Sequence, residues 1–381
     1  MNPETEIAPT ELPLPTPVPP AAPPEPAETR FLKWLVFGSR GVRVGWSVAL
    51  FFTLFFIASG ILGAIFFIAM GPSIQTKLEQ FSPKSALLSE CLQFVPLLIA
   101  AAISALIERR SILDYNLRGN HRLLHFATGL IGGVAALSLL VAALHAGGWL
   151  NFGAPALSGP QILQMGALWA FAFLLTGFSE EGMTRCYMLF TLTRGINYWW
   201  ALGSVTCFSL FALANPHSNG AAGVYLMAAL GVIPCLLLHL KKSPSASFWQ
   251  AAWLTSTLFG YIHTFNKGET WIGIFSAAAI GFAFCVSVRL TGSAWWAIGF
   301  HAAWDWTQTF FYGTADSGLV AHGHYLTTTP TGAVLWSGGS AGPEGSLLVI
   351  PTVLLVIAAL VAIYGRRKSN AHSELAANPA L

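Results

Sequence analysis

Charged residues are scarce in this 381-residue chain. Only 9% of the residues are Asp, Glu, Lys or Arg, and 54% are hydrophobic, whereas a soluble domain carries about 25% charged residues. So little charge excludes a soluble globular protein of this size, because polar groups could not cover its surface. The formal net charge of +3 is too small to indicate a nucleic-acid partner, which requires clustered basic residues.

Cysteine is also rare, and its spacing excludes two kinds of site. The chain has five cysteines, all in or beside apolar segments. None shows the short paired spacing of a zinc knuckle or a redox motif. We therefore interpret them as small buried hydrophobic residues. They are Cys91, Cys186, Cys207, Cys235 and Cys285.

What the chain has in abundance is long apolar stretches. Residues 44–70 and 347–364 each meet the roughly 20 residues that a helical span needs. Lipid permits only helices or closed barrels, and barrel strands would show short alternating patterns instead. The sequence therefore predicts an all-α fold, a polytopic transmembrane helical bundle of about 8 to 10 spans. Candidate spans are 44–70, 86–107, 124–148, 161–179, 199–214, 222–240, 248–264, 271–288, 294–311 and 346–364.

The segments between the spans predict the topology. Residues 1–29 are rich in Pro, Glu, Ala and Thr and cannot bury enough apolar surface to become ordered, so we expect a disordered tail. Basic residues gather in alternate connections, and the positive-inside rule then places both termini in the cytoplasm. We expect an integral protein of a bacterial inner or plasma membrane. The expected units are the tail 1–29, N-terminal helices 30–160, a core 161–311 with a helical hairpin at about 201–250, an outer loop 312–345, and a last helix with a cytoplasmic tail 346–381.

Ionisable side chains inside apolar segments cost at least about 2.5 kcal/mol at a helix centre, so each needs a reason. Glu181 and Arg185 are four residues apart and can form an ion pair on one helix face. Glu180 is rotated by about 100° from Glu181 and is free to face another group. Glu90, near the start of the second span, could simply reach the membrane interface.

Two histidines lie at the ends of later apolar segments. His301 and Asp305 are four apart and share one stripe, and His263 follows Phe259 at the same spacing. Carboxylates with imidazoles can activate a water molecule and stabilise a tetrahedral intermediate, and they are equally a ligand set for Zn²⁺. Taken singly, each group also has a structural interpretation, as an ion pair or an interhelical hydrogen-bond clamp.

Three of these groups resemble the motifs of one family. Residues 180–185 read EEGMTR and match EExxxR, residues 259–263 read FGYIH and match FxxxH, and residues 301–305 read HAAWD and match HxxxN or HxxxD. In this order they resemble the CAAX-protease and bacteriocin-processing (CPBP, or Abi) family of intramembrane metalloproteases. The resemblance covers roughly residues 160–310.

The resemblance implies a function for each group. It makes the protein an endopeptidase that hydrolyses peptide bonds in or near the bilayer, with prenylated CaaX C-termini, leader peptides or membrane-protein segments as substrates. It also implies a divalent metal, with zinc as first candidate, bound by Glu180, His263, His301 and Asp305. Glu180 would be the general base, His263 would assist it or share the metal, His301 and Asp305 would hold the oxyanion or complete the metal shell, and Glu181, Arg185 and Phe259 would support the site.

The chain departs from the family pattern in three places. Thr184 and Cys186 stand where the family has an aromatic residue and a glycine, and residues 201–250 lengthen the distance between the first two motifs. The last motif ends in Asp305, and an ionised Asp cannot donate a hydrogen bond to an oxyanion as Asn can. Asp305 is therefore expected to be protonated, to orient His301 or to face a cation.

Two other functions agree with the same residues. A catalytically silent member could act as a membrane scaffold or immunity protein. A proton-coupled secondary transporter could relay protons through midplane carboxylates and histidines, although the hydropathy of the two halves shows no inverted repeat. Substitution of Glu180 separates these functions, because a scaffold should tolerate it and a protease should not.

Overall fold

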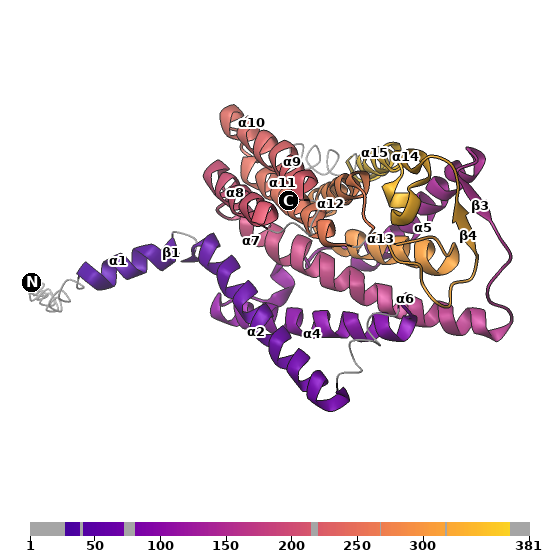
Figure 1. Ribbon diagram of the computed structural model, residues 1–381. Coiled ribbons are helices and arrows are strands. Elements are labelled where there is room, and N and C mark those ends of the chain that lie inside the picture. Colours follow the sequence, from indigo (N-terminus) through magenta and orange to yellow (C-terminus); the bar gives the residue numbers. More distant parts are fainter. Residues whose placement is uncertain are drawn as a thin grey trace, which may run out of the picture.

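The structure is a computed structural model that describes residues 27–38, 41–71, 81–214, 220–266, 268–316 and 318–365. Most of the predicted disordered tail and the basic C-terminal segment 366–381 lie outside these residues. The described part is an assembly of packed helices, and the N-terminal helix α1 (Ala27–Val36) projects away from it (Figure 1). The predicted all-α class is confirmed.

The helices follow one another with few strands between them. The helical segments are α2 (Val44–Met70), α4 (Pro83–Ile107), η1 (Ile112–Asp114), α5 (Arg122–Ala146), α6 (Pro160–Glu181), η2 (Gly182–Met188), α7 (Leu189–Thr193), α8 (Tyr198–Ala214), α9 (Gly220–Leu226), η3 (Met227–Val232), α10 (Ile233–Lys241), α11 (Ala246–Ile262), η4 (His263–Phe265), α12 (Trp271–Thr291), α13 (Trp295–Asp305), η5 (Trp306–Phe311), α14 (Val334–Ser337), η6 (Gly339–Ala341), η7 (Pro343–Gly345), α15 (Val349–Leu360) and η8 (Val361–Gly365). Two small antiparallel pairs join β1 (Phe37–Gly38) to β2 (Gly41–Val42) and β3 (Leu150–Phe152) to β4 (Thr328–Pro330).

Within the described residues, six helices are long and apolar enough to cross a membrane. The other four predicted spans are helices too, but they are shorter. α8 and α11 have 17 residues each, α13 has 11 before it continues as the π-helical segment η5, and α15 has 12 before it continues as η8. The six are Val44–Met70, Pro83–Ile107, Arg122–Ala146, Pro160–Thr193, Gly223–Lys241 and Trp271–Thr291.

The span predicted at 161–179 is longer than expected. Helices α6 and α7 are joined without a break through the π-helical segment η2, giving one 34-residue helix. A π-helical turn widens the helix and often occurs at functional sites. Here it begins directly after Glu181, so it sets the direction in which the side chains of the EExxxR motif leave the helix.

Helices α5 and α13 approach each other backbone to backbone. A Cβ atom on Gly129 would lie 2.2 Å from the carbonyl oxygen of Trp296, and one on Gly299 would lie 2.4 Å from that of Phe126. Small residues permit such close crossings inside membranes. The crossing holds α13, and with it His301, at the centre of the bundle.

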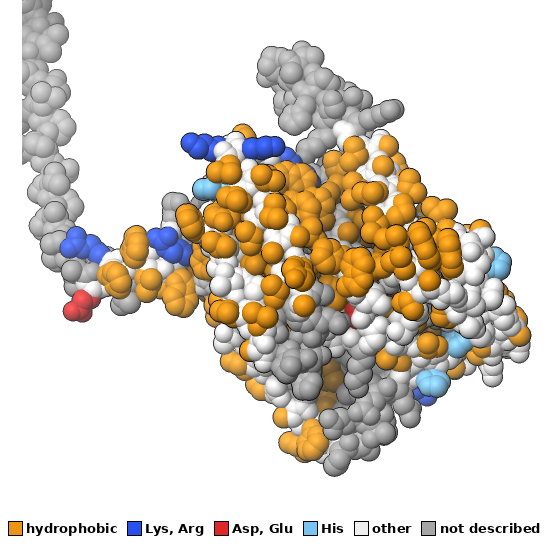
Figure 2. Space-filling model, turned by 45° about the horizontal axis from the view of Figure 1, so that its top comes forward, with side chains coloured by type: hydrophobic (Ala, Val, Ile, Leu, Met, Phe, Trp, Pro, Cys, Tyr) orange, Lys and Arg blue, Asp and Glu red, His pale blue; other side chains and the backbone are white. Residues whose placement is uncertain are grey.

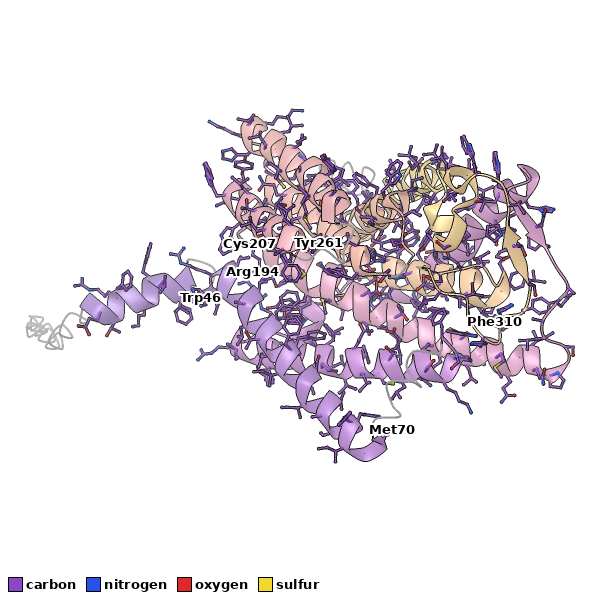
Figure 3. The ribbon with its side chains drawn as sticks, in the orientation of Figure 1. Trp46, Met70, Arg194, Cys207, Tyr261 and Phe310 are labelled. Carbon is purple, nitrogen blue, oxygen red and sulfur yellow. The ribbon has the colours of Figure 1, made fainter. Side chains whose placement is uncertain are left out.

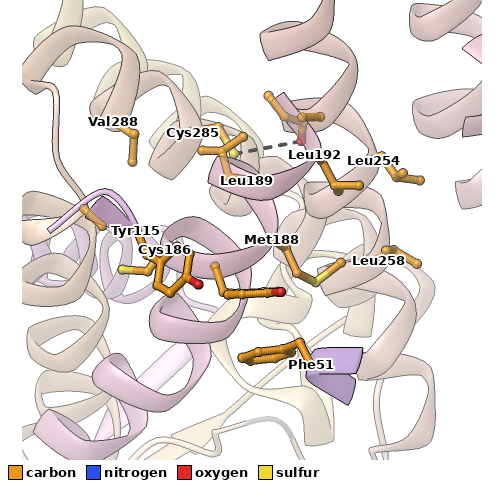
Figure 4. Packing of buried hydrophobic residues seen from close by; sticks show 14 of the residues in the cluster. Phe51, Tyr115, Cys186, Met188, Leu189, Leu192, Leu254, Leu258, Cys285 and Val288 are labelled. Atoms are coloured by element: carbon orange, nitrogen blue, oxygen red, sulfur yellow. Dashed lines mark hydrogen bonds between the residues drawn. The ribbon is translucent and has the colours of Figure 1, made fainter. Parts of the chain in front are cut away.

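The largest hydrophobic cluster lies next to η2. The ring of Phe51 stacks on Tyr187 with centroids 3.8 Å apart, and Figure 4 shows Phe51, Cys186 and Met188 among the buried side chains of this cluster. Cys186, Cys235 and Cys285 are buried and Cys91 is half-buried, as expected. Cys207 is exposed on α8 (Figure 3), so the prediction of a buried side chain is wrong there, because α8 lies at the edge of the bundle.

The outer surface is largely apolar. Figure 2 shows hydrophobic side chains across most of the visible face, with Lys and Arg gathered at its edges. Large hydrophobic residues on the long helices, such as Ile61 of α2, Leu123 of α5 and Leu163 of α6, are exposed. In water such a surface would be unfavourable, and in lipid it is the expected covering. The protein is therefore an integral membrane protein.

Candidate active site

Arg185 lies buried at the bottom of the site. Its side chain and that of Glu181 are both fully buried, and Arg185 Nε lies 3.2 Å from Glu181 Oε2. Arg185 Nη1 donates to Thr184 Oγ1 at 2.6 Å, and the guanidinium carbon lies 4.6 Å from the centroid of the Phe259 ring. A guanidinium over an aromatic face is stabilised by the ring quadrupole, so the predicted ion pair is also held from a second helix.

Neighbouring backbone makes room for this arginine. A Cβ atom on Gly281 of α12 would lie 2.3 Å from Arg185 Nη2, so any larger residue there would displace the guanidinium. The carbonyl oxygen of Arg185 accepts a hydrogen bond of 2.7 Å from Asn116 Nδ2. Thr184, one of the departures from the family pattern, accepts a hydrogen bond from Arg185 Nη1 and so supports the Glu181–Arg185 ion pair.

His301 is oriented by Glu181. Its Nδ1 lies 2.8 Å from Glu181 Oε1, and since a carboxylate only accepts, Nδ1 is the donor. Its Nε2 lies 3.7 Å from Glu180 Oε2 and 3.5 Å from Asp305 Oδ2, longer than ordinary direct hydrogen bonds. Three motif carboxylates therefore surround one imidazole, and Nε2 faces the two that are not already bonded to Nδ1.

The two adjacent glutamates face different surroundings. The side chain of Glu181 is fully buried, whereas that of Glu180 is 36% exposed and lines a cavity. This is the outcome that the 100° rotation between consecutive helical residues predicts. Glu180 is therefore the carboxylate that a molecule in the cavity can reach.

His263 lies in the same cavity, where it contacts Phe259 of its own motif. Its Nδ1 donates to the carbonyl oxygen of Phe259 at 2.7 Å, which leaves Nε2 as the acceptor in the neutral ring. The Phe259 ring lies between the two histidines, 4.8 Å from His263 and 6.0 Å from His301 by ring centroids. The structure thus places His263 across an aromatic spacer from His301.

The cavity has a volume of about 610 Å³ and joins the three motifs. Its wall on the α2 side carries Phe52, Phe55 and Phe56. No Lys or Arg side chain of the described residues lines it. Carboxyl groups do, and besides Glu180 and Asp305 they are Glu90, Asp316 and Glu344.

Glu90, Asp316 and Glu344 are functional candidates that the sequence analysis missed. The sequence suggests that Glu90 could simply reach the membrane interface, whereas it lies in the cavity wall and its Oε2 is buried without a hydrogen-bond partner. The signal was present, because an ionisable residue inside an apolar span is costly. Asp316 and Glu344 lie in the Gly-rich outer loop, where no sequence pattern marks them.

The outer loop covers one side of the site. Thr309 Oγ1 donates to Asp316 Oδ2 at 2.7 Å, and Trp304 Nε1 donates to Glu344 Oε1 at 2.8 Å. Both donors lie on the continuous helix that carries His301, so hydrogen bonds hold the loop to this helix. Residues 312–345 therefore contribute carboxyl groups to the cavity as well as connecting two helices.

Burial changes the acidity of these loop carboxyl groups. It raises the pKa of Glu344 to about 8, and the negative charges of Asp316 and Glu269 add to this effect. It also raises the pKa of Asp316 above its usual range. Part of the negative charge expected from the cavity's carboxyl groups is thus removed by protonation near neutral pH.

The predicted metal ligands are not arranged around a common point. Among the residues that the structure describes, no three His, Cys, Asp or Glu side chains are grouped so that they could hold a metal ion. In both histidines Nδ1 donates a hydrogen bond, to Glu181 in His301 and to the Phe259 carbonyl in His263, so only the two Nε2 atoms are left to bind a metal. The side chains as placed do not fit a bound divalent metal, so no step below uses one, and the metal stays a prediction from the sequence.

One further pattern was not predicted. Residues 338–342 read GGSAG, the G-x-S-x-G spacing of a serine-hydrolase nucleophile. Such a serine stands on a sharp turn between a strand and a helix, whereas Ser340 lies in the single turn η6 and donates to the carbonyl oxygen of Gly268 at 3.1 Å. The match therefore lacks the structural context of a nucleophile.

Comparison with known families agrees with the second and third motifs. The family model described as type II CAAX prenyl endopeptidase Rce1-like matches residues 234–307. This segment is similar to Rce1-like endopeptidases. The match includes His263, His301 and Asp305 and begins after the first motif, so the resemblance to CAAX proteases is confirmed over residues 234–307. No curated protein and no solved structure matches the chain.

Proposed function

We propose that the protein is an intramembrane endopeptidase in which Glu180 activates a water molecule for attack on a peptide bond. The observation that carries the proposal is the arrangement around the cavity. Glu180 and the Nε2 atom of His301, 3.7 Å apart, face a 610 Å³ space inside a membrane bundle. The Rce1-like match over residues 234–307 supports the same class of reaction.

In this mechanism Glu180 acts as the general base. Water gives a proton to Glu180 and its oxygen bonds to the scissile carbonyl carbon. When the tetrahedral intermediate collapses, the C–N bond breaks and Glu180 returns the proton to the leaving amine. The gap between Glu180 and His301 is longer than a direct hydrogen bond, and such a gap can be bridged by water. His263 Nε2, as an acceptor, can orient this water.

His301 is the group placed to stabilise the oxyanion. Because Glu181 accepts from Nδ1, the imidazole is fixed and Nε2 points toward Glu180 and Asp305. A protonated Nε2 can donate to the negative oxygen as it forms. Asp305, 3.5 Å away, then has the role of orienting His301, one of the roles left open by the sequence.

The lining of the cavity bears on the substrate. Carboxyl groups line it, whereas described Lys and Arg side chains do not. A free C-terminal carboxylate, as on a CaaX peptide, would lie near like charges and be disfavoured. Among the predicted substrates, an internal membrane-protein segment or leader peptide therefore fits better than a free terminus, and the aromatic α2 wall suits an apolar side chain or a prenyl group.

The experiment is cleavage of membrane-anchored peptides by the purified protein. The panel contains prenylated CaaX peptides with free and amidated C-termini, together with internal transmembrane segments. Wild-type protein is compared with Glu180→Gln and with the control Glu28→Gln on α1, outside the cavity. We expect cleavage by wild type and control, none by Glu180→Gln, and no advantage of the free over the amidated terminus.

If no peptide is cleaved, further measurements separate the alternative functions. If folded wild-type protein cleaves nothing and Glu180→Gln retains the cellular phenotype, the scaffold or immunity function replaces the proposal. If the protein cleaves nothing but couples solute uptake to a proton gradient in liposomes, the transporter replaces it.

A further inference from the structure

Helix α1 presents an amphipathic surface outside the bundle. Phe31, Trp34 and Leu35 are spaced i, i+3 and i+4, so they share one face of the helix, and all three are exposed. Lys33 lies on the opposite side of the helix and Arg30 lies at the border of the apolar face, one turn before Trp34; both are exposed. Figure 2 shows both kinds of side chain on this projecting segment. Such a helix is typical of segments that lie in the plane of a membrane interface.

The helix is fastened to the start of α2. Arg43 Nε donates to the carbonyl oxygen of Trp34 at 2.8 Å, and its guanidinium carbon lies 5.1 Å from the Trp34 ring centroid. Trp46 Nε1 donates to the carbonyl oxygen of Leu35 at 3.0 Å. The β1–β2 pair closes the turn between the two helices. α1 therefore has a defined position at the end of a transmembrane helix.

Other basic residues lie at the same level of the bundle. A Cβ atom on Gly41, in the turn after α1, would lie 3.8 Å from Arg194 Nη2. Arg194 and Arg110 both contact Glu108 at the end of α4, at 2.9 and 2.8 Å. Figure 3 shows Arg194 near the end of α2 that carries Trp46 and far from Met70 at the other end. α1 is thus beside a basic rim, where the bundle meets the membrane surface.

We propose that α1 docks on an anionic lipid surface at the face of the bilayer where α2 begins. Phe31, Trp34 and Leu35 would enter the acyl boundary, and Arg30 and Lys33 would lie among negatively charged headgroups. Aromatic and basic side chains combined in this way fit anionic membranes, and each basic residue near such a surface strengthens binding about five-fold. For Arg30 and Lys33 together the effect is roughly 30-fold.

Docking of α1 would affect the cavity through α2. Only 6% of the most hydrophobic stretch of α2 is buried in the protein, so most of this helix is left to face lipid. Yet Phe52, Phe55 and Phe56 of α2 form one wall of the cavity. A lipid-bound α1 would fix the position of that wall, and the docking itself does not depend on the proposed peptidase activity.

The test is amide hydrogen exchange of residues 27–36 in the full-length protein. The protein is placed in nanodiscs of phosphatidylcholine alone or of equal parts phosphatidylcholine and phosphatidylglycerol. A helix of this length is marginal in water, so docking on lipid should increase the protection of its amides. We expect protection to rise by roughly 30-fold with phosphatidylglycerol, and to fall when salt screens the charges.

Two variants and a control make the result specific. Arg30→Gln/Lys33→Gln should remove most of the phosphatidylglycerol effect, and Phe31→Ser/Leu35→Ser should reduce protection in both kinds of nanodisc. The control Lys241→Gln/Lys242→Gln removes an exposed basic pair at the end of α10 and should leave α1 unchanged. Equal exchange in both lipids would overturn the proposal. Protection that depends on protein concentration, and not on lipid charge, would instead assign the surface to a second copy of the chain.

Discussion

Replacement of Arg185 by Met tests how the site is held together. Arg185 and Glu181 are both fully buried, and the guanidinium also contacts Thr184 and the ring of Phe259. Met is apolar and of similar length, so packing against Phe259 is largely kept. The substitution therefore removes the charge and leaves Glu181 buried without its cation.

The expected loss follows from this burial. Removing one partner of a buried ion pair costs about 3–5 kcal/mol of unfolding free energy, because the remaining charge is uncompensated. Removing both partners is often close to neutral. Glu181→Gln/Arg185→Met should therefore recover most of the loss and approach the wild type to within about 1 kcal/mol. The Gln side chain still offers His301 an acceptor.

The assay is reversible unfolding in mixed micelles, followed by helix content. Arg289→Met is the matched control, since Arg289 is an exposed arginine at the end of α12, 5.7 Å from the ring centroid of Phe248. An exposed pair of this kind contributes less than about 1 kcal/mol. A single variant as stable as the wild type, or a double variant no better than the single one, would refute the reasoning.

Three other changes test separate parts of the site. Glu90→Leu should raise the unfolding free energy by about 1 kcal/mol, since it removes a buried oxygen without a hydrogen-bond partner, and it should lower kcat/KM. A loss of stability with full activity would contradict a functional role for Glu90. Glu344→Gln should raise the Tm at about pH 9 and not at about pH 5. The pKa of Glu344 is raised to about 8 in the folded state, so its protonated form stabilises the fold at low pH. This stabilisation, at most about 5 kcal/mol, is lost as the pH rises through 8. Because the described side chains form no metal site, cleavage should survive chelation, whereas loss with EDTA and recovery with Zn²⁺ would support the ligand set predicted from the sequence.

Much of the fold follows from composition and hydropathy. The apolar stretches predict the helices because lipid offers the backbone no hydrogen-bond partners, and a helix satisfies these bonds within itself. Helix α2 begins and ends where predicted, at Val44 and Met70. What hydropathy cannot give is the π-helical joint η2, which depends on how Arg185 and its neighbours pack. Two points stay predictions: that residues 201–250 are an inserted helical hairpin, and that both termini lie in the cytoplasm.

The candidate site was partly predictable for a related reason. Residues four apart on one helix must share a face, so the pairs Glu181–Arg185 and His301–Asp305 could be read from spacing. The contact between Glu181 and His301 joins residues 120 positions apart and needs the crossing of α6 and α13. Asp316 and Glu344 reach the cavity through loop packing, which has no period in the sequence.

The most direct test of the central claim is a single-turnover cleavage in H₂¹⁸O. If Glu180 activates water for direct attack, the new C-terminal carboxylate of the wild-type product should carry one ¹⁸O atom, and Glu180→Gln, folded and inserted normally, should give no product. Product without ¹⁸O, or labelled product from Glu180→Gln at the wild-type rate, would contradict the account.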